Sequence, residues 1–192
     1  MKSFRNYLNS KILAAQLQNK ILIIGGSGLL GEDLAIYLSS LYDVTCTHYK
    51  NPLNKSNCKS IFLDLNNIDQ LSEKISDLNP NVVINCTAYT NVDLAETNRY
   101  ECRKINYEGV RNLCNCLGKD VYLIHISTDY VFDGKKGDYN EEDFPLPINY
   151  YGRTKLEGEN YSRGNFDSYL ILRPNVLYSS NIIKNNFFSW IY

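Results

Sequence analysis

Short apolar runs alternate along the chain with longer segments of helical period. The runs are rich in β-branched residues and cover 20–24, 43–49, 60–65, 81–86, 121–127 and 168–173. After the third run, Ile68, Leu71, Ile75 and Leu78 recur at steps of three and four, which is the spacing of one buried helix face. This alternation is typical of parallel βαβ units with helices on both faces of a sheet. The pattern predicts an α/β fold with a Rossmann-type, doubly wound parallel sheet.

Glycine and proline mark further helix limits. Gly118 closes a helix expected over residues 100–117, since glycine is favoured just past a helix end. Pro145 and Pro147 indicate a loop, and a further helix is expected to start near Tyr150.

Composition and charge narrow the class of protein. A chain of 192 residues, 44% apolar and 21% charged, is expected to form one globular domain. Its net charge of -1 provides no electrostatic footprint for nucleic acid or an anionic membrane. Polar residues interrupt the apolar stretch that a signal peptide needs, so the first residues are not expected to be one. They are expected to form a short amphipathic helix or a frayed extension. With no apolar run long enough for a membrane span, the chain is placed in the cytoplasm.

The six cysteines favour buried, reduced thiols. They form no C-x-x-C pair, and only two histidines accompany them, so neither a zinc site nor a disulfide framework is expected.

The segment GGSGLLG joins the first predicted strand to a helical pattern. Its Gly25, Gly28 and Gly31 allow a sharp turn and a close approach to a pyrophosphate, which the positive end of the following helix attracts. Ser27, Leu29 and Leu30 belong to the same turn. The simpler alternative is a tight loop with close helix packing, but the strand before it and the helix after it favour a dinucleotide site.

The end of the second strand bears on the choice of cofactor. An acidic residue about 20 positions after such a turn binds the ribose of NAD, and none occurs there. His48 and Lys50 could instead meet a 2′-phosphate, which favours NADPH over NADH, although a solvated strand end would look the same. Asp64, with Leu65 beside it, is a candidate for the adenine end, or alternatively a cap of the next helix.

Tyr151 and Lys155 are four residues apart and therefore share a helix face. A nearby ammonium would favour the ionised phenol, so this pair could donate a proton to a developing alkoxide. Thr128 closes the fifth strand, where ligands of open α/β sheets bind, and its hydroxyl could hydrogen-bond a substrate carbonyl. The simpler alternatives are a chance pair on an exposed helix and a hydroxyl that caps its own turn.

Five strings resemble, in this order, the dTDP-4-dehydrorhamnose reductase family of extended short-chain dehydrogenases: GGSGLLG, NCTAYTNVDLAE, HISTDYVFDG, NYYGRTKLEGE and LILRPNVLY. The resemblance covers about residues 20–178 and implies that Thr128, Tyr151 and Lys155 carry catalysis. It implies cofactor contacts from Cys86, Thr87, Ala88, Tyr89, Ser127, Lys155 and Arg173, and substrate contacts from Thr128, Asp129, Tyr130 and Tyr151. It also suggests Glu32 as a magnesium ligand at a dimer contact, for which an exposed helix glutamate is the simpler account.

The implied activity is the NAD(P)H-dependent reduction of a 4-keto-6-deoxy sugar on a nucleotide carrier. A rival is a non-catalytic, NADP-binding relative, the regulatory β subunit of methionine adenosyltransferase, which has a similar S-D-Y-V-F-D-G string. Thr128 and the string AYTNVD at residues 88–93 favour the reductase. A third possibility is a cofactor-binding remnant without turnover.

The last residues depart from the family pattern. Relatives have V-Y-G where this chain has LYSS, and residues 174–192 resemble only the beginning of a substrate-binding region. We therefore expect an N-terminal extension over 1–19, an NAD(P)-binding Rossmann domain over 20–173 and an incomplete substrate region after it. The aromatic end of the chain suggests self-association, such as a homodimer, a partner or instability.

Overall fold

The computed structural model describes residues 2–14, 20–53 and 58–177. Their strands form one six-stranded sheet in the order β3-β2-β1-β4-β5-β6, which confirms the predicted Rossmann-type α/β fold. The chain divides into two compact units, which are described separately. Of the described residues, the first unit holds 2–14, 20–53, 58–63, 78–86 and 176–177, and the second holds 64–77 and 87–175.

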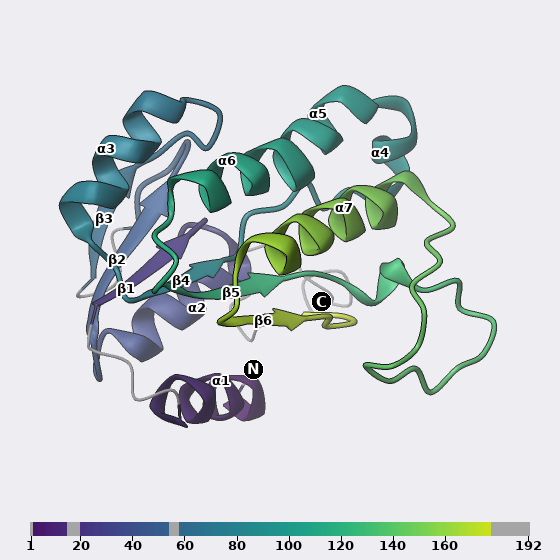
Figure 1. The fold of residues 1–192 in the computed structure, drawn as a ribbon, viewed down its shortest axis with the longest axis horizontal. Helices are drawn as coiled ribbons and strands as arrows, with labels where there is room; N and C mark the ends of the chain where they lie inside the picture. The colour runs from purple at the N-terminus through teal and green to yellow at the C-terminus, as the bar shows by residue number, and fades with distance from the viewer. Residues whose placement is uncertain (1, 15–19, 54–57, 178–192) are drawn as a thin grey trace, which may run out of the picture. The chain divides into compact units, whose positions relative to one another are not determined.

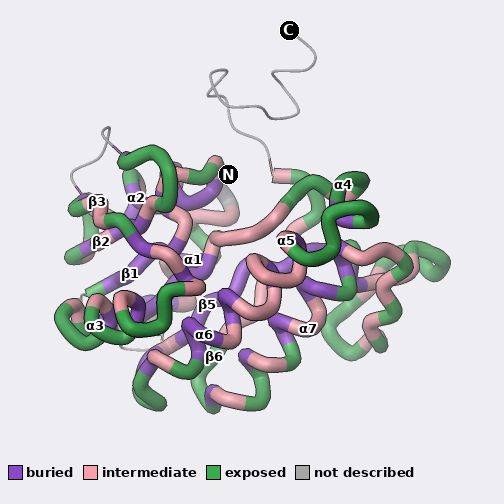
Figure 2. The backbone as a smooth tube through the Cα atoms, turned by 90° about the horizontal axis from the view of Figure 1, so that it is seen from above, coloured by how far each residue is buried: buried purple, intermediate pink, exposed green. Residues whose placement is uncertain are grey.

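The first unit is built on β1 (Lys20–Ile24), which pairs in parallel with β2 (Asp43–His48) and with β4 (Val82–Asn85). On the far side of β2 lies β3 (Lys59–Phe62), also parallel. β1 is buried from its second residue onward, as expected for a central strand of a parallel sheet, and Figure 2 shows its buried residues in purple.

Two helices belong to the first unit, α1 (Lys2–Ala14) and α2 (Leu29–Leu38). The prediction of a short amphipathic helix at the N-terminus is confirmed, because Leu8 and Ile12 of α1 are buried. An ion pair joins Arg5 of α1 to Asp33 of α2, and the two helices lie side by side in Figure 1. This contact holds the N-terminal helix against α2.

The second unit contains two parallel strands, β5 (Tyr122–Ile126) and β6 (Tyr169–Leu172), packed against α7 (Tyr150–Asn165). Its other elements are α3 (Ile68–Leu78), α4 (Val92–Thr97), α5 (Arg99–Arg103), the π-helical segment η1 (Lys104–Glu108), α6 (Gly109–Cys116) and the 3-10 turn η2 (Asp129–Val131). The single helix expected over 100–117 is therefore α-helix, π-helix and α-helix in succession. Figure 1 shows α6 and α7 running beside each other.

The third strand is shorter than expected, and the structure corrects one alternative there. β3 ends at Phe62, so Asp64 lies beyond the strand. Its carboxylate accepts a hydrogen bond from the Asn66 amide, whereas the Asn67 side chain accepts one from the Gln70 amide in the first turn of α3. The alternative that Asp64 caps the helix is wrong, because Asn67 occupies the capping position.

All six cysteines are free, as expected, and four of them are buried. Among the described residues, no helix is both long enough and apolar enough to cross a membrane.

Candidate functional site

The glycine turn lies in the first unit, and its glycines meet different demands. Gly25 has φ 79°, a left-handed conformation that glycine adopts without strain. A Cβ on Gly31 would lie 2.2 Å from the Gly25 carbonyl oxygen, so this position requires glycine for packing. Gly26 is similarly confined, since a Cβ there would lie 2.5 Å from the Cβ of Cys46. Close packing, the simpler alternative, thus explains in part why glycines occupy this turn.

Gly28 leaves the N-terminal end of α2 suited to binding an anion. It is the N-cap of α2 and supplies no side-chain cap. The first amides of a helix have no partner within the helix, and their dipoles favour a negative charge. The turn therefore has the backbone shape and polarity that a pyrophosphate requires.

Thr47 of β2 fixes the start of this turn, a role the sequence did not reveal. The Gly25 amide donates to the Thr47 hydroxyl at 3.1 Å, and the Gly26 amide donates to the Thr47 carbonyl at 2.7 Å. Thr47 is itself buried. Two successive backbone groups of the turn are thus tied to one residue of the neighbouring strand.

The two residues considered for a 2′-phosphate, His48 and Lys50, lie at the end of β2 and just after it. The Nδ1 atom of His48 lies 2.9 Å from the Ser60 hydroxyl of β3, which orients the imidazole ring. Lys50 is exposed two residues later. Tyr49 stacks on Phe62 with ring centroids 6.0 Å apart, also at this edge. The predicted pair therefore lies at the same end of the strand.

In the second unit, the segment after β4 is held by a side chain from the π-helical segment. The Asn106 amide accepts a hydrogen bond from the Tyr89 N–H at 2.8 Å and donates to the Tyr89 carbonyl at 3.2 Å. It also donates to the Thr154 hydroxyl of α7 at 3.1 Å. Asn106 is fully buried, so its bonds fix the predicted cofactor segment that ends at Tyr89.

The three predicted catalytic residues are all buried in the second unit. Thr128 follows β5, while Tyr151 and Lys155 lie on α7. The Thr128 hydroxyl lies close enough to the Tyr151 phenol to influence its pKa. The Lys155 ammonium donates to the Ile126 carbonyl of β5 at 2.6 Å. The structure thus brings the threonine and tyrosine hydroxyls together and places the lysine one helical turn further along.

The environment of Tyr151 differs from the expectation. Burial raises the pKa of its phenol above 10.0, and the nearby Thr128 hydroxyl opposes that rise only in part. The nearby carboxylate of Asp129 raises the pKa further. The net lowering of this pKa that the Lys155 charge led us to expect is therefore not found, because loss of hydration outweighs the interactions that favour the phenolate.

Thr128 also caps its own turn, as the simpler alternative proposed. Its side chain accepts a hydrogen bond from the Tyr130 amide at 3.2 Å and donates to the Asp129 carboxylate at 3.2 Å. The same contacts orient the hydroxyl toward the end of β5, so the capping role and a catalytic role use one side-chain position.

The start of α7 is built to bring Tyr151 to this place. Asn149 is the N-cap, and its side chain accepts a hydrogen bond from the Gly152 amide at 2.7 Å. The rings of Tyr130 and Tyr151 then meet edge to face, with centroids 5.8 Å apart. These contacts fix the first turn of α7 against η2.

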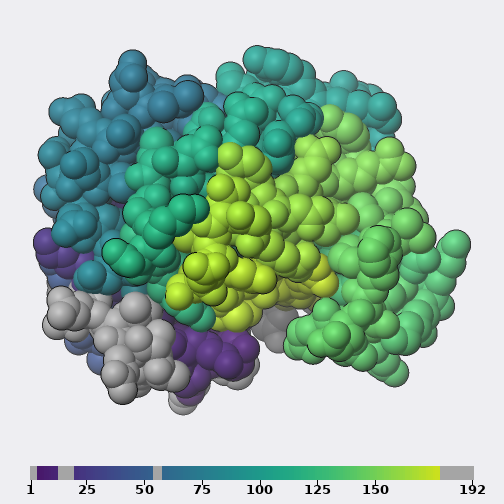
Figure 3. All heavy atoms as spheres, in the orientation of Figure 1, coloured from purple at the N-terminus to yellow at the C-terminus, as the bar shows by residue number. Residues whose placement is uncertain are grey.

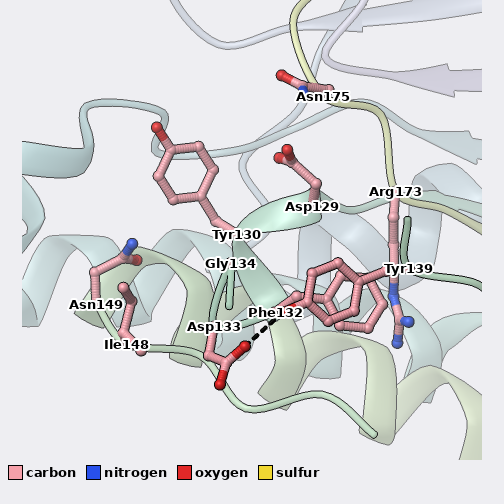
Figure 4. Close-up of a pocket in the computed structure, with 10 residues that line it drawn as sticks. All are labelled: Asp129, Tyr130, Phe132, Asp133, Gly134, Tyr139, Ile148, Asn149, Arg173 and Asn175. Carbon is pink, nitrogen blue, oxygen red and sulfur yellow. Dashed lines mark hydrogen bonds between the residues drawn. The ribbon is translucent and has the colours of Figure 1, made fainter. Parts of the chain in front are cut away.

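A cavity of about 430 Å³ opens beside Thr128. It is lined by Asp129, Tyr130, Phe132, Asp133, Gly134, Tyr139, Ile148, Asn149, Arg173 and Asn175. Figure 4 shows the stacked rings of Phe132 and Tyr139 on one side and the Asp129 carboxylate on another. The sequence predicted Asp129 and Tyr130 for the substrate, but it missed the stacked rings, which a long loop brings back to the strand end. Figure 3 shows that loop in green beside the yellow-green atoms of α7 and β6.

Arg173, expected near the cofactor, is held by a carboxylate. Its guanidinium donates to both oxygens of Glu159, at 2.9 and 2.7 Å, and lies over the Phe132 ring. Glu159 is fully buried on α7, and nothing in the sequence singled it out.

Glu32, the candidate magnesium ligand, is 7% exposed in the first turn of α2, so its description as an exposed helix glutamate is wrong. Within the described ranges, no three histidine, cysteine or acidic side chains gather as a metal site would require.

Comparisons with known proteins give matches that cover most of the chain. A family model described as RmlD substrate binding domain matches residues 19–192. A dTDP-4-dehydrorhamnose reductase of Aggregatibacter actinomycetemcomitans is 34% identical over 172 residues, which are 86% of this chain and 55% of that protein. The methionine adenosyltransferase 2 subunit beta of Xenopus tropicalis is 35% identical over 166 residues, covering 83% of this chain and 47% of that one.

Among solved structures, the dTDP-4-dehydrorhamnose reductase of Bacillus anthracis str. Ames, determined in complex with NADP, superposes with a TM-score of 0.79. It is 33% identical, and the match covers 91% of this chain and 59% of that one. The chain spans about half the length of the curated relatives it matches.

Proposed function

The chain belongs to the family described as RmlD substrate binding domain, and we propose that it acts in the NADPH-dependent reduction of a nucleotide-linked 4-keto-6-deoxy sugar. One observation carries the proposal: the buried side chains of Thr128 and Tyr151 lie close together just after the carboxyl end of β5. Ligands of open α/β sheets bind at that edge. The relatives named dTDP-4-dehydrorhamnose reductase support the substrate class.

The residues present fit the cofactor. NADPH, when bound, supplies a hydride to the carbonyl carbon of the sugar. We assign its pyrophosphate to the turn at Gly25 and Gly28, where a left-handed glycine and an uncapped helix end lie together. His48 and Lys50 are assigned to the 2′-phosphate, and NADH is the alternative if they do not engage one. The further cofactor contacts proposed are Ser27, Leu29, Leu30, Gly31, Asp64, Leu65, Cys86, Thr87, Ala88, Tyr89, Ser127 and Lys155.

Tyr151 is proposed as the proton donor. Its raised pKa keeps the phenol protonated at neutral pH, so the proton is present when negative charge develops on the substrate oxygen. The Thr128 hydroxyl donates a second hydrogen bond to that oxygen, for which it must leave the Asp129 carboxylate. Lys155 is bonded to the Ile126 carbonyl and lies one turn from Tyr151, where its charge favours the phenolate that remains after proton transfer.

The cavity beside Thr128 is proposed for the sugar. Asp129 and the amides of Asn149 and Asn175 offer acceptors and donors that suit hydroxyl groups, and the Tyr130 and Phe132 rings offer apolar faces. This chemistry supports a polar ring of the size of a hexose rather than an apolar ligand.

The alternative function is that of a non-catalytic regulatory subunit that binds NADP and a partner enzyme. It is supported by the 35% identity to the methionine adenosyltransferase 2 subunit beta, which is close to the 34% identity to the Aggregatibacter actinomycetemcomitans reductase. A regulatory subunit requires no proton donor, so the two proposals differ in what a change at Tyr151 does.

The test is to incubate the purified chain with NADPH and a dTDP-4-keto-6-deoxy sugar and to follow the nicotinamide absorbance. We expect turnover, its loss in Tyr151→Phe, a low but measurable rate in Thr128→Val, and unchanged NADPH binding in both variants. NADPH binding without turnover in the parent chain would contradict the reductase and favour the regulatory function. An absence of NADPH binding would contradict both.

Four further expectations stay predictions. The first concerns the domains: an extension over 1–19, a dinucleotide-binding domain over 20–173 and a substrate region from 174. The others are assembly into a homodimer, location in the cytoplasm, and magnesium binding at Glu32. Residues 178–192, on which the expected self-association depends, lie outside the described part of the chain.

A further inference from the structure

Three buried side chains follow one another along a single face of α7. Tyr151, Lys155 and Glu159 are spaced by four residues and are 8%, 1% and 0% exposed. We call these three residues the α7 seam. Each contacts the sheet edge or the segment just after it. Tyr151 lies close to Thr128, Lys155 donates a hydrogen bond to the Ile126 carbonyl, and Glu159 accepts hydrogen bonds from Arg173, just after β6.

The bond at the far end of the seam is the most directional of the three. Arg173 donates from Nε to one oxygen of Glu159 and from a terminal nitrogen to the other, at 2.9 and 2.7 Å. Two parallel bonds between planar groups fix both distance and rotation, which a single bond does not. Because Glu159 is fully buried, this interaction is little screened by solvent.

The chain on both sides of Arg173 is hydrogen-bonded to the segment that carries Thr128. The Ser127 amide donates to the Leu172 carbonyl at 2.7 Å, and the Asp129 amide donates to the Pro174 carbonyl at 3.3 Å. The residues on both sides of Arg173 therefore hold the residues on both sides of Thr128. The Arg173 guanidinium also covers the Phe132 ring, just after η2.

From this arrangement we propose that Glu159 and Arg173 are positioning residues, which set the rotation and height of α7 so that the Tyr151 hydroxyl meets the Thr128 hydroxyl. The inference rests on the proposed function for the role of those hydroxyls. It replaces the cofactor contact expected of Arg173 with an action through α7 and the end of β5.

A third contact on the same carboxylate offers a matched control. Arg163 donates to the second oxygen of Glu159 at 3.0 Å, but its side chain is partly exposed and lies on α7 itself. It cannot fix the helix against the strand. Arg163→Gln removes a charged partner of Glu159 and leaves the contact between α7 and β6 in place.

The experiment compares Arg173→Gln, Arg173→Lys and Arg163→Gln in the full chain. We measure kcat, the KM for the keto-sugar and the Kd for NADPH. Misplacing a reacting group by about 1 Å can lower a rate about 100-fold, and we expect a fall in kcat of that order in Arg173→Gln with an unchanged Kd. Arg173→Lys, which lacks the planar fork, should restore only part of the rate, whereas Arg163→Gln should resemble the parent chain.

A double variant separates positioning from a general loss of stability. If Arg173 acts through the two hydroxyls, Thr128→Val combined with Arg173→Gln should be no slower than Thr128→Val alone. Additive losses would overturn the proposal, as would a weakened Kd for NADPH with kcat retained, which would restore the cofactor role.

Glu159→Gln leaves Arg173 buried without its counter-charge and can fail to fold. The neutral double variant Glu159→Gln with Arg173→Gln avoids this problem and should show the same low kcat and normal Kd.

A readout without turnover keeps the inference separate from the proposed function. With tyrosine labelled by ¹³C at Cζ, the pKa of Tyr151 is followed by NMR, and its signal is identified by its absence in Tyr151→Phe. Both the burial of Tyr151 and its closeness to Thr128 depend on the position of α7, so the pKa should change in Arg173→Gln and not in Arg163→Gln. An unchanged pKa in Arg173→Gln would overturn the inference even if the parent chain shows no turnover.

Discussion

Gly152 lies directly against the backbone of Tyr130: a Cβ added to Gly152 would be 2.2 Å from the Tyr130 carbonyl oxygen and 3.0 Å from its carbon. This approach brings the first turn of α7 onto η2, and with it the Tyr151 ring onto the Tyr130 ring. The absence of a side chain at one helical position thus determines where the proposed proton donor lies.

Gly152→Ala should therefore destabilise the protein. The obstructing atoms are backbone and cannot rotate away, so we expect a loss of about 1–3 kcal/mol in the free energy of unfolding, measured in urea, together with reduced turnover. Gly164→Ala is the control, because no atom lies within 4 Å of its added Cβ. Since alanine favours a helix over glycine by up to about 1 kcal/mol, this control should be neutral or stabilising. Equal effects of the two substitutions would contradict the packing account.

Thr47→Val should weaken NADPH binding. The methyl group fills the space of the hydroxyl but cannot accept the Gly25 amide, and leaving such a group unpaired costs about 1–3 kcal/mol. Part of that cost appears as a looser glycine turn, so the Kd for NADPH measured by cofactor fluorescence should rise. Thr47→Ser retains the acceptor and should bind like the parent chain. If both variants bind NADPH normally, the turn does not depend on this hydroxyl.

The stability of the protein should fall in mild acid because of His125. This side chain is 1% exposed on β5, and burial, followed by the charge of Lys155, lowers its pKa well below 6.5. Below pH 6.5 the unfolded chain binds a proton that the folded chain does not, so stability is complete above that pH and declines as the pH falls through it.

The size of this effect can be measured by urea unfolding. Between about pH 7.5 and about pH 5.5, the parent chain should lose about 1 kcal/mol more than His125→Gln. His48 is unchanged in both proteins, so the comparison isolates the change at His125. The same pH dependence in both proteins would rule out His125 as the cause.

The sequence predicted the fold well because its strongest signals are local. Apolar runs, the helix stripe from Ile68 to Leu78 and the glycine turn each depend on neighbouring residues. Five of the six expected strands lie within one position of their expected bounds. The strand ends were less certain, since β3 stops at Phe62 and leaves Asp64 in a turn. The catalytic candidates were found from their spacing and their resemblance to a family.

What the sequence could not reveal depends on contacts between distant segments. Asn106 looks like any polar helix residue, but the π-helical turn directs it to Tyr89. Burial reverses the expected shift in the pKa of Tyr151, and burial cannot be read from four residues of spacing. Glu159 occupies the next position on the face of Tyr151 and Lys155, but the sequence did not single it out, because only the fold places Arg173 opposite it.

The bond between Lys155 and the Ile126 carbonyl also has a chemical consequence. An amine that is 1% exposed and already donating a hydrogen bond is shielded from acylating reagents, unlike the exposed Lys50. Modification at this one amine would therefore require α7 to lift away from β5. The rate at which Lys155 reacts with such a reagent would therefore measure how often α7 opens.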